Sequence, residues 1–220
     1  MKRAISCFLL ASMMFFTASA QAKYALSQVM NKKLKDKEVT IHNVVVLPPG
    51  VKMTKQGIRG SEGVTKEEDD AMRTLVTSVS AALKQNGVSV DTPFSDEALK
   101  DNNDLKYAVA DVQRKFDQIA PQLNRKLKDV RKGRFSLGDM VAVLNSKGNA
   151  DALVFVRAEG VKESAGRALL TNGQFGWRFT TRVVVVDAKN GDVLLVCTGI
   201  GGLPKEKTFD KPFRKALASR

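Results

Sequence analysis

The sequence predicts an α/β domain built on a mixed, mostly five-stranded sheet flanked by helices, with a long amphipathic helical insertion. Three observations predict it. Apolar residues run consecutively at several places, as in strands that are covered on both faces. A strand–helix–strand unit lies near the amino end, and the last third is rich in strand signals. The hydrophobic content of 43% is enough for a packed core.

The first twenty residues have the pattern of a cleaved secretory signal. Lys2 and Arg3 precede an uncharged apolar run over residues 4–18, and small residues at Ala18 and Ala20 fit a signal-peptidase site. The alternative is an uncleaved anchor, but the run is barely long enough to cross a bilayer and ends in small residues rather than charges. We therefore expect a periplasmic or secreted protein, with residues 1–20 removed and no transmembrane segment in the rest.

The charge and the number of cysteines narrow the class of protein that the sequence indicates. The formal net charge of +13 falls to +11 once Lys2 and Arg3 are removed. Cys7 leaves with the signal and, lying early in the apolar run, is not a lipidation site. Only Cys197 then remains, so no intrachain disulfide can form. We expect Cys197 to be a small buried apolar residue, the alternative being a reactive or intermolecular thiol.

The elements follow in order. Residues 21–38 form a basic amino-terminal segment that is weakly helical from residue 24 to 37, and residues 39–220 form a single α/β domain. Residues 39–47 predict a central strand, stopped by Pro48-Pro49-Gly50. Residues 51–64 carry three glycines and no period, which indicates a long surface loop.

A core-facing helix comes next. Thr65-Lys66-Glu67-Glu68 is a capping-box pattern, and acidic residues favour the first turn of a helix. Asn86-Gly87 ends the helix, and residues 88–90 begin a short strand that should lie parallel to the first. The apolar positions recur at steps of three and four, at Met72, Leu75, Val76, Val79, Ala82 and Leu83.

The long helical insertion covers residues 105–130. Pro121 interrupts it, so we expect a kink or two abutting helices there. Ser136-Leu137-Gly138-Asp139 then opens another helix, with Met140, Val141 and Leu144 inward and Gly148 at its end. The inward positions of the long helix are Leu105, Val109, Val112, Phe116, Ile119, Leu123, Leu127 and Val130.

The last third supplies three more strands, over residues 152–156, 177–186 and 193–198. The last two should be antiparallel, because Asp187-Ala188-Lys189-Asn190-Gly191-Asp192 between them has the chemistry of a tight turn. Residues 160–176 make a long connection between the first two of these strands. A short amphipathic helix over residues 209–220 closes the chain.

No catalytic or metal-binding pattern stands out, and we expect no cofactor. His42, the only histidine, lies in the first strand with no nucleophile beside it in sequence. Glu67, Glu68, Asp69 and Asp70 point in different directions along a helix and fit a solvated helix start better than paired catalytic carboxylates. The glycines of residues 57–63 and 199–202 match no phosphate-binding loop.

The excess of positive charge is the one unusual feature of the composition. A solvated helix face explains part of it, because cations favour the carboxyl end of a helix. The alternative is a surface that contacts a polyanion such as an anionic lipid, lipopolysaccharide or an acidic polysaccharide. Nucleic acid is not expected, since neither stacking aromatics nor a known motif is present. The residues of this possible polyanion contact are Arg125, Lys126, Lys128, Arg131, Lys132 and Arg134, with a second cluster at Lys32, Lys33, Lys35 and Lys37.

Phe175 and Trp177 are the candidates for a contact with a protein partner. They lie among glycines at the end of the long connection over residues 160–176. The alternative is that Trp177 starts the strand and packs over the end of the sheet.

Three motifs follow one another along the chain: Val44-Val45-Val46-Leu47-Pro48-Pro49, Ala150-Asp151-Ala152-Leu153-Val154-Phe155 and Val185-Val186-Asp187-Ala188-Lys189-Asn190-Gly191-Asp192-Val193-Leu194. Their order resembles the TolB amino-terminal-like and curli-secretion-lipoprotein-like family of bacterial periplasmic proteins. The resemblance covers residues 39–199 and implies a non-enzymatic role in envelope assembly or secretion, with protein partners. The chain departs from the family in lacking a lipid-carrying cysteine and in its long helix.

The sequence thus leaves three functions open. The first is a soluble periplasmic accessory or interaction protein of the cell envelope, without enzymatic activity. The second is a binder of an anionic envelope component through the basic helix surface. The third is an enzyme whose carboxylate or lysine site has no recognisable motif.

Overall fold

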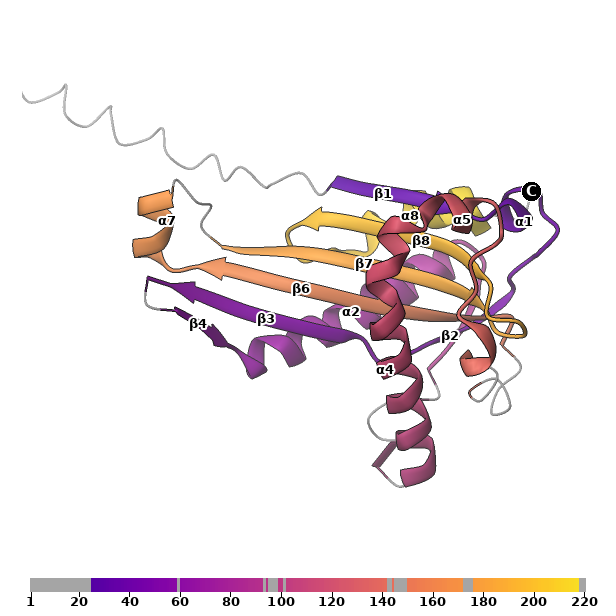
Figure 1. The fold of residues 1–220 in the computed structure, drawn as a ribbon, viewed down its shortest axis with the longest axis horizontal. Helices are drawn as coiled ribbons and strands as arrows, with labels where there is room; N and C mark the ends of the chain where they lie inside the picture. The colour runs from indigo at the N-terminus through magenta and orange to yellow at the C-terminus, as the bar shows by residue number, and fades with distance from the viewer. Residues whose placement is uncertain are drawn as a thin grey trace, which may run out of the picture.

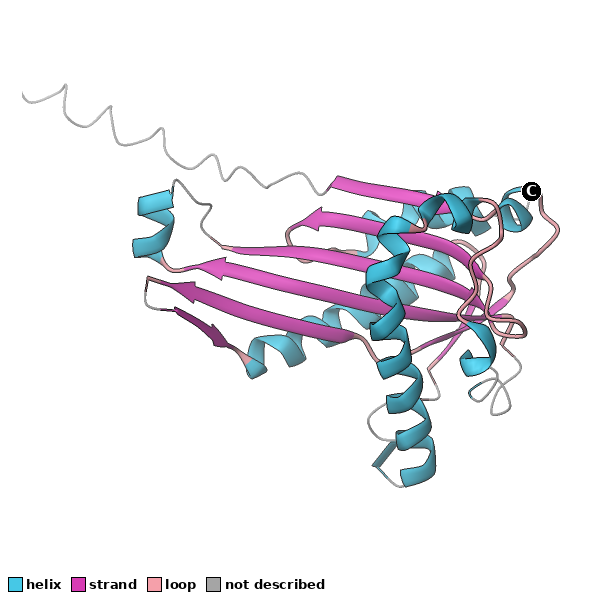
Figure 2. Cartoon of the chain, viewed as in Figure 1, coloured by secondary structure: helices cyan, strands magenta, loops and turns pink. Residues whose placement is uncertain are grey.

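The computed structural model describes residues 25–58, 60–92, 94, 99–100, 102–141, 144, 150–171 and 176–217. The predicted signal peptide and Phe175 therefore lie outside the described residues. Within those ranges the chain forms a mixed sheet with helices on both faces, which confirms the predicted α/β class (Figures 1 and 2).

The sheet has eight strands within the described residues rather than the five expected. The spatial order is β1-β8-β7-β6-β2-β5, with β3 paired to β6 beyond β2 and β4 paired to β3. The three strands that the sequence did not predict are β1, β3 and β4. The strands are β1 (Ala25–Met30), β2 (Asn43–Val46), β3 (Gly50–Gly57), β4 (Gly60–Gly63), β5 (Ser89–Asp91), β6 (Ala152–Glu163), β7 (Trp177–Asp187) and β8 (Val193–Gly201).

Two prolines separate β2 from β3, which pair one after the other with the same strand, β6. Both strands run parallel to β6: Val46 lies opposite Val154, and Gly50 lies opposite Arg157. Pro48 and Pro49, between them, have no N–H and cannot continue the ladder. The segment predicted as a loop over residues 51–64 is therefore a hairpin, β3–β4, which exists because β6 extends far enough to pair with it.

The amino-terminal segment also differs from the prediction. Residues 25–30 form the edge strand β1, antiparallel to β8, and only α1 (Lys32–Lys35) is helical. Leu26 and Met30 pack against one core and Val29 against the other, so these side chains do not share one side as a helix would require. Backbone pairing with β8 overrides a weak local helical pattern.

Two apolar cores lie on the two faces of the sheet, as the consecutive apolar strands predicted. On one face Val154 and Val183 pack with α2 (Thr65–Gln85) and α8 (Glu206–Leu217). On the other, Phe155 stacks on Phe116 of α4 (Asn103–Arg125), with ring centroids 4.4 Å apart. Figure 1 shows α4 crossing in front of the sheet, with α2 behind it.

The helix ends correct several expectations. α4 continues through Pro121 and breaks at Lys126, and α5 (Leu127–Arg131) follows at once. The cap of α2 is Val64, with no side-chain bond, so Thr65 does not form the predicted capping box. Gly138–Val141 begins as a 3-10 turn, η1; Val141 and Leu144 are buried as predicted, and the predicted end of this helix at Gly148 lies outside the described residues.

Candidate polyanion-binding surface

The six cations predicted as a possible polyanion contact lie around the break between α4 and α5. Arg125 ends α4, Lys126 forms the break, and Lys128 and Arg131 belong to α5. Lys132 and Arg134 follow in the next turns, and all six side chains are exposed. Leu123 and Val130 are fully buried beneath them. The local fold is therefore amphipathic, with its charged side facing solvent.

One carboxylate neutralises part of this charge. Asp129 lies 3.7 Å from the Lys126 Nζ and 3.2 Å from the Arg134 Nη2. The described residues provide no ion pair for the other four cations, which are Arg125, Lys128, Arg131 and Lys132. These four therefore carry the free charge of the surface.

The second basic cluster lies on and after α1. Lys35 and Lys37 are exposed, whereas Lys33 is tied down by a 2.7 Å ion pair from its Nζ to Asp192 Oδ2. The hydrogen bond to Asp192 raises the pKa of Lys33, and the negative charge of the same carboxylate adds to the effect. α1 is thus fastened to the turn between β7 and β8.

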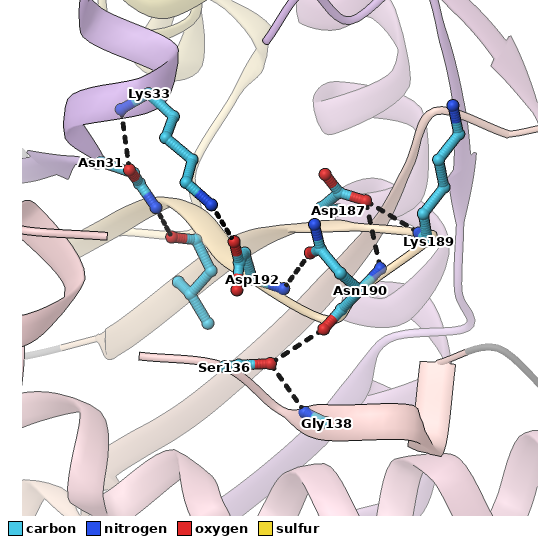
Figure 3. Close-up of polar contacts among 9 residues, drawn as sticks. Asn31, Lys33, Ser136, Gly138, Asp187, Lys189, Asn190 and Asp192 are labelled. Atoms are coloured by element: carbon cyan, nitrogen blue, oxygen red, sulfur yellow. Dashed lines mark hydrogen bonds and ion pairs between the residues drawn. The ribbon is translucent and has the colours of Figure 1, made fainter. Parts of the chain in front are cut away.

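Asn31 holds α1 at this position. Its side chain is completely buried; the Nδ2 donates to the Val193 carbonyl at 3.0 Å, and the Oδ1 accepts from the Lys33 N–H at 2.9 Å (Figure 3). The second bond makes Asn31 the N-cap of α1. One buried amide therefore joins the start of α1 to the start of β8.

The chain after α5 reaches the same place. A Cβ built on Gly133 would lie 3.0 Å from the Asn31 Oδ1, so the two segments are in close contact. The Val193 N–H donates to the Phe135 carbonyl at 3.0 Å, and Ser136 forms an isolated bridge with Asp192. The two basic segments, about a hundred residues apart in sequence, meet at one end of the sheet.

The turn between β7 and β8 is the common support. The Asp187 carboxylate accepts from the Lys189 and Asn190 N–H groups, and the Asn190 side chain accepts from the Asp192 N–H at 2.8 Å (Figure 3). Gly191 has a φ of 74°, which favours glycine. The tight turn predicted from the sequence is confirmed, and its carboxylates serve the backbone and Lys33.

The end of α8 lies at the same end of the molecule, packed on the other face of the sheet from α4 and α5. Figure 1 shows α1, α5 and the last turn of α8 gathered at one end of the molecule. Arg214 and Lys215 in that last turn are exposed. We call the combined surface the basic end; its residues are Lys32, Lys35, Lys37, Arg125, Lys126, Lys128, Arg131, Lys132, Arg134, Arg214 and Lys215.

Trp177 does not belong to the basic end. It begins β7, whose other terminus, Asp187, lies at the basic end roughly 33 Å away for a strand of this length. Trp177 is half-buried, packs at 6.2 Å from the Phe179 ring and lies beneath the Lys162 ammonium. Trp177 and the residues of the predicted polyanion contact are thus at opposite ends of the sheet.

The residues considered for catalysis are dispersed. Cys197 is buried in β8, as predicted, and burial raises its pKa to about 12. His42 is exposed. A hydrogen bond from its own N–H, followed by one from Lys55, lowers the pKa of Glu67, whereas the Glu68 carboxylate accepts from the Met53 N–H. Within the described ranges, no three His, Cys, Asp or Glu side chains are grouped to hold a metal ion.

The clefts add a pair of arginines that sequence reasoning missed. One cleft, of about 370 Å³, lies where α4 meets β3, β6 and β7. In it Arg182 donates to the Ala120 carbonyl at 3.0 Å and to Asn124, and burial lowers its pKa. Arg157 pairs with Asp117 and lies over the Phe116 ring. Both side chains hold α4 on the sheet, and no sequence pattern marked them.

A larger cleft, of about 590 Å³, lies between α2 and the carboxyl ends of β2 and β5. Its apolar lining includes Met72, Val76 and Phe94. Its polar side chains, Asp69, Arg73, Thr77 and Thr92, are all exposed. They do not form a buried convergent group of the kind that an active site uses.

Comparisons with known proteins add little. No family model and no curated protein matches the chain, so the resemblance to TolB-like proteins remains a prediction. Similar solved structures are the PelC dodecamer from Paraburkholderia phytofirmans (12% identity, 90% of this chain and 99% of that one, TM-score 0.44) and a point variant of it (12%, 89% and 99%, 0.44). The LpoB C-terminal domain from Salmonella enterica is a third (9%, 79% and 96%, 0.29). Likenesses at these TM-scores carry no argument about function. No helix among the described residues has the length and apolarity to cross a bilayer.

Proposed function

We propose that this chain is an exported, non-enzymatic accessory protein of the cell envelope that docks on an anionic component through its basic end. One observation supports this proposal: α1 and the segment after the α4–α5 junction both contact the turn between β7 and β8 or the start of β8. Folding brings cations from distant parts of the sequence to one end of the sheet, where Asp36 pairs with Lys32, and Asp129 pairs with Lys126 and Arg134. An extended field of one sign attracts polyanions.

The sequence indicates the cellular compartment in which the proposed function would take place. The predicted signal peptide sends the chain out of the cytoplasm, where the available polyanions are anionic lipid, lipopolysaccharide and acidic polymers. Amino-terminal sequencing of the protein from its native host should begin at Gln21 or Lys23. Recovery of the intact Met1 form in the membrane fraction would contradict export with cleavage.

Vesicle binding tests the basic end. The chain without residues 1–20 is mixed with phosphatidylcholine vesicles that contain or lack phosphatidylglycerol, and bound protein is measured by cosedimentation. We expect binding only to the anionic vesicles, weakening steeply as salt is raised. Replacement of Arg125, Lys128, Arg131 and Lys132 by glutamine should reduce affinity about a hundredfold or more, at about 1 kcal/mol per cation.

A matched variant controls for net charge. Lys52, Lys66, Lys106 and Arg178 are equally exposed but lie outside the basic end, and their replacement by glutamine removes the same four charges. This variant should bind almost as wild type, and both variants should keep the wild-type thermal midpoint. Equal loss in the two variants, or binding that does not respond to salt, would refute the proposal.

Two further probes identify the source of the anion. Lipopolysaccharide added to the vesicles and free alginate are tested in the same assay. Preference for alginate over every vesicle identifies an acidic polymer as the partner class, and preference for lipopolysaccharide identifies an outer-membrane surface. Absence of binding to all three at low ionic strength would leave the basic end as a solvated face.

A further inference from the structure

The outer edge of β1 is a feature of the sheet that the proposed function does not use. β1 is the last strand on its side of the sheet, and among the described residues it pairs with no strand other than β8. The Asn31 N–H donates to the Leu194 carbonyl opposite it, at 2.8 Å. Because the direction of the backbone groups alternates in an antiparallel pair, Val29 and Ser27 also face β8. The N–H and C=O groups of Leu26, Gln28 and Met30 therefore face outward.

Edge strands often carry charges, prolines or bulges that discourage pairing, and β1 has no such residue and pairs with β8 in an unbroken register. Its six residues include no charge, proline or glycine. β4, by contrast, has four residues with Glu62 and a glycine at each end, and β5 has three residues ending in Asp91. A regular, uncharged edge is a template for a further strand.

We infer that β1 pairs with β1 of a second copy of this chain, antiparallel and about a twofold axis at Gln28. The outward groups fall at alternate residues centred on Gln28, so Gln28 meets its own copy and Leu26 meets Met30 in both directions. Each of these three pairs exchanges two hydrogen bonds. The two sheets become one continuous sheet, and the edge supplies a complete set of donors and acceptors for itself.

Side chains and charge favour this occupant. Leu26, Val29 and Met30 are only half-buried and border the two cores, so a second β1 extends both apolar layers across the junction. β1 ends where the basic end begins, at α1. Antiparallel pairing therefore directs the two basic ends away from each other, whereas a parallel arrangement would bring like charges together.

Matched variants at one position test the pairing. Gln28→Pro removes the outward N–H at the centre of the ladder, and Gln28→Ala keeps that N–H while losing the side-chain bond to the Pro212 carbonyl. Sedimentation velocity of the chain without residues 1–20 should show a dimer for wild type and Gln28→Ala. Gln28→Pro should dimerise at least tenfold more weakly. Should Gln28→Pro fail to fold, Leu26→Lys places a charge on the same edge and should weaken the dimer likewise.

Crosslinking tests the register. In the inferred pair Ser27 lies opposite Val29 of the second copy at a non-hydrogen-bonded site, where Cα atoms lie about 4.5 Å apart, within the range of a disulfide. The double variant Ser27→Cys with Val29→Cys should give a covalent dimer on oxidation, and Ser27→Cys alone should not. A wild-type chain that stays monomeric at high protein concentration and high salt, or a dimer that both edge variants retain, would overturn the inference.

Salt separates this inference from the proposed function. Raising the ionic strength screens the repulsion between two chains of like charge and should strengthen the dimer, whereas it should weaken docking on anionic vesicles. The edge variants leave every cation of the basic end in place. Loss of dimerisation without loss of vesicle binding, or the reverse, therefore shows which of the two has failed.

Discussion

Replacing Asn31 by alanine should destabilise the whole domain although it changes one amide. The substitution removes the N-cap of α1, worth about 1 kcal/mol. It also leaves the Val193 carbonyl, within a buried strand start, without its side-chain donor, which costs about 1–3 kcal/mol. The sum is about 2–4 kcal/mol. With a urea slope of about 2 kcal/mol/M, the unfolding midpoint should fall by about 1–2 M.

Two further variants separate the contributions of Asn31. Asn31→Asp keeps the oxygen that caps α1 but points a buried carboxylate at the Val193 carbonyl, so it should destabilise at least as much as alanine. Lys33→Met removes only the ion pair to Asp192, in which the Lys33 side chain is 42% exposed, and should cost less than about 1 kcal/mol. Urea denaturation followed by circular dichroism measures all three.

The refuting result for Asn31 is specific. An Asn31→Ala chain whose free energy of unfolding stays within about 0.5 kcal/mol of wild type would show that the amide does not secure α1. The joint support of the two basic segments would then have to come from backbone contacts alone. Anionic vesicle binding by the same variant should weaken, because α1 would no longer be fixed beside α5.

Three other substitutions have defined outcomes. Val154→Asp buries a carboxylate at a site with 0% exposure and should abolish folding by circular dichroism, whereas Val161→Asp on the same strand, 37% exposed, should fold. Gly191→Ala should cost about 2 kcal/mol or more in urea denaturation, because its Cβ would meet the backbone of η1, while Gly87→Ala, with a similar φ and open space, should cost about 1 kcal/mol. The Cys197 thiol keeps its proton in the folded chain to a pKa of about 12 but loses it near 9 when unfolded, so stability falls as pH rises between these values. By pH 10 the loss should be about 1.4 kcal/mol larger in wild type than in Cys197→Ala, and equal pH profiles would contradict it.

The sheet core was predictable because it depends on local composition. Val183–Val186 and Leu153–Val156 are apolar at consecutive positions, and a strand covered on both faces is the arrangement that buries them all. The helix α2 was equally predictable from the spacing of its apolar residues. Predicting these features requires no knowledge of which other segments they contact.

The edge strand β1 and the β3–β4 hairpin were not predictable, because their structure depends on distant partners. Residues 25–30 show a weak helical spacing and become β1 only through β8, and residues 51–64 become a hairpin only through the far half of β6. At Pro121, by contrast, tertiary packing preserves a helix that the sequence alone suggested would be interrupted. A single proline did not break α4, which packs on the sheet through Phe116 and Leu123 on either side of it.

The candidate site was predictable only in its parts. The cations at residues 125–134 were visible as a cluster, as were the lysines of α1, but their meeting depends on Asn31, Gly133 and the start of β8. The roles of Arg157 and Arg182 were hidden for a related reason. An arginine in a strand acquires its role from the helix that happens to cross above it.

The pairing of β1 with β8 has a consequence for how the chain acquires its structure. The Ser27 hydroxyl bonds to the Thr198 carbonyl across 171 residues of sequence, so the first strand has no partner until nearly all of the chain is present. In the proposed export the amino end would emerge first, and β1 would have no strand to pair with until β8 follows. Closing so long a loop is slow, because its entropy must be lost before the contact is gained. We therefore expect the basic end to assemble late in folding, because its segments are held together by contacts with the start of β8.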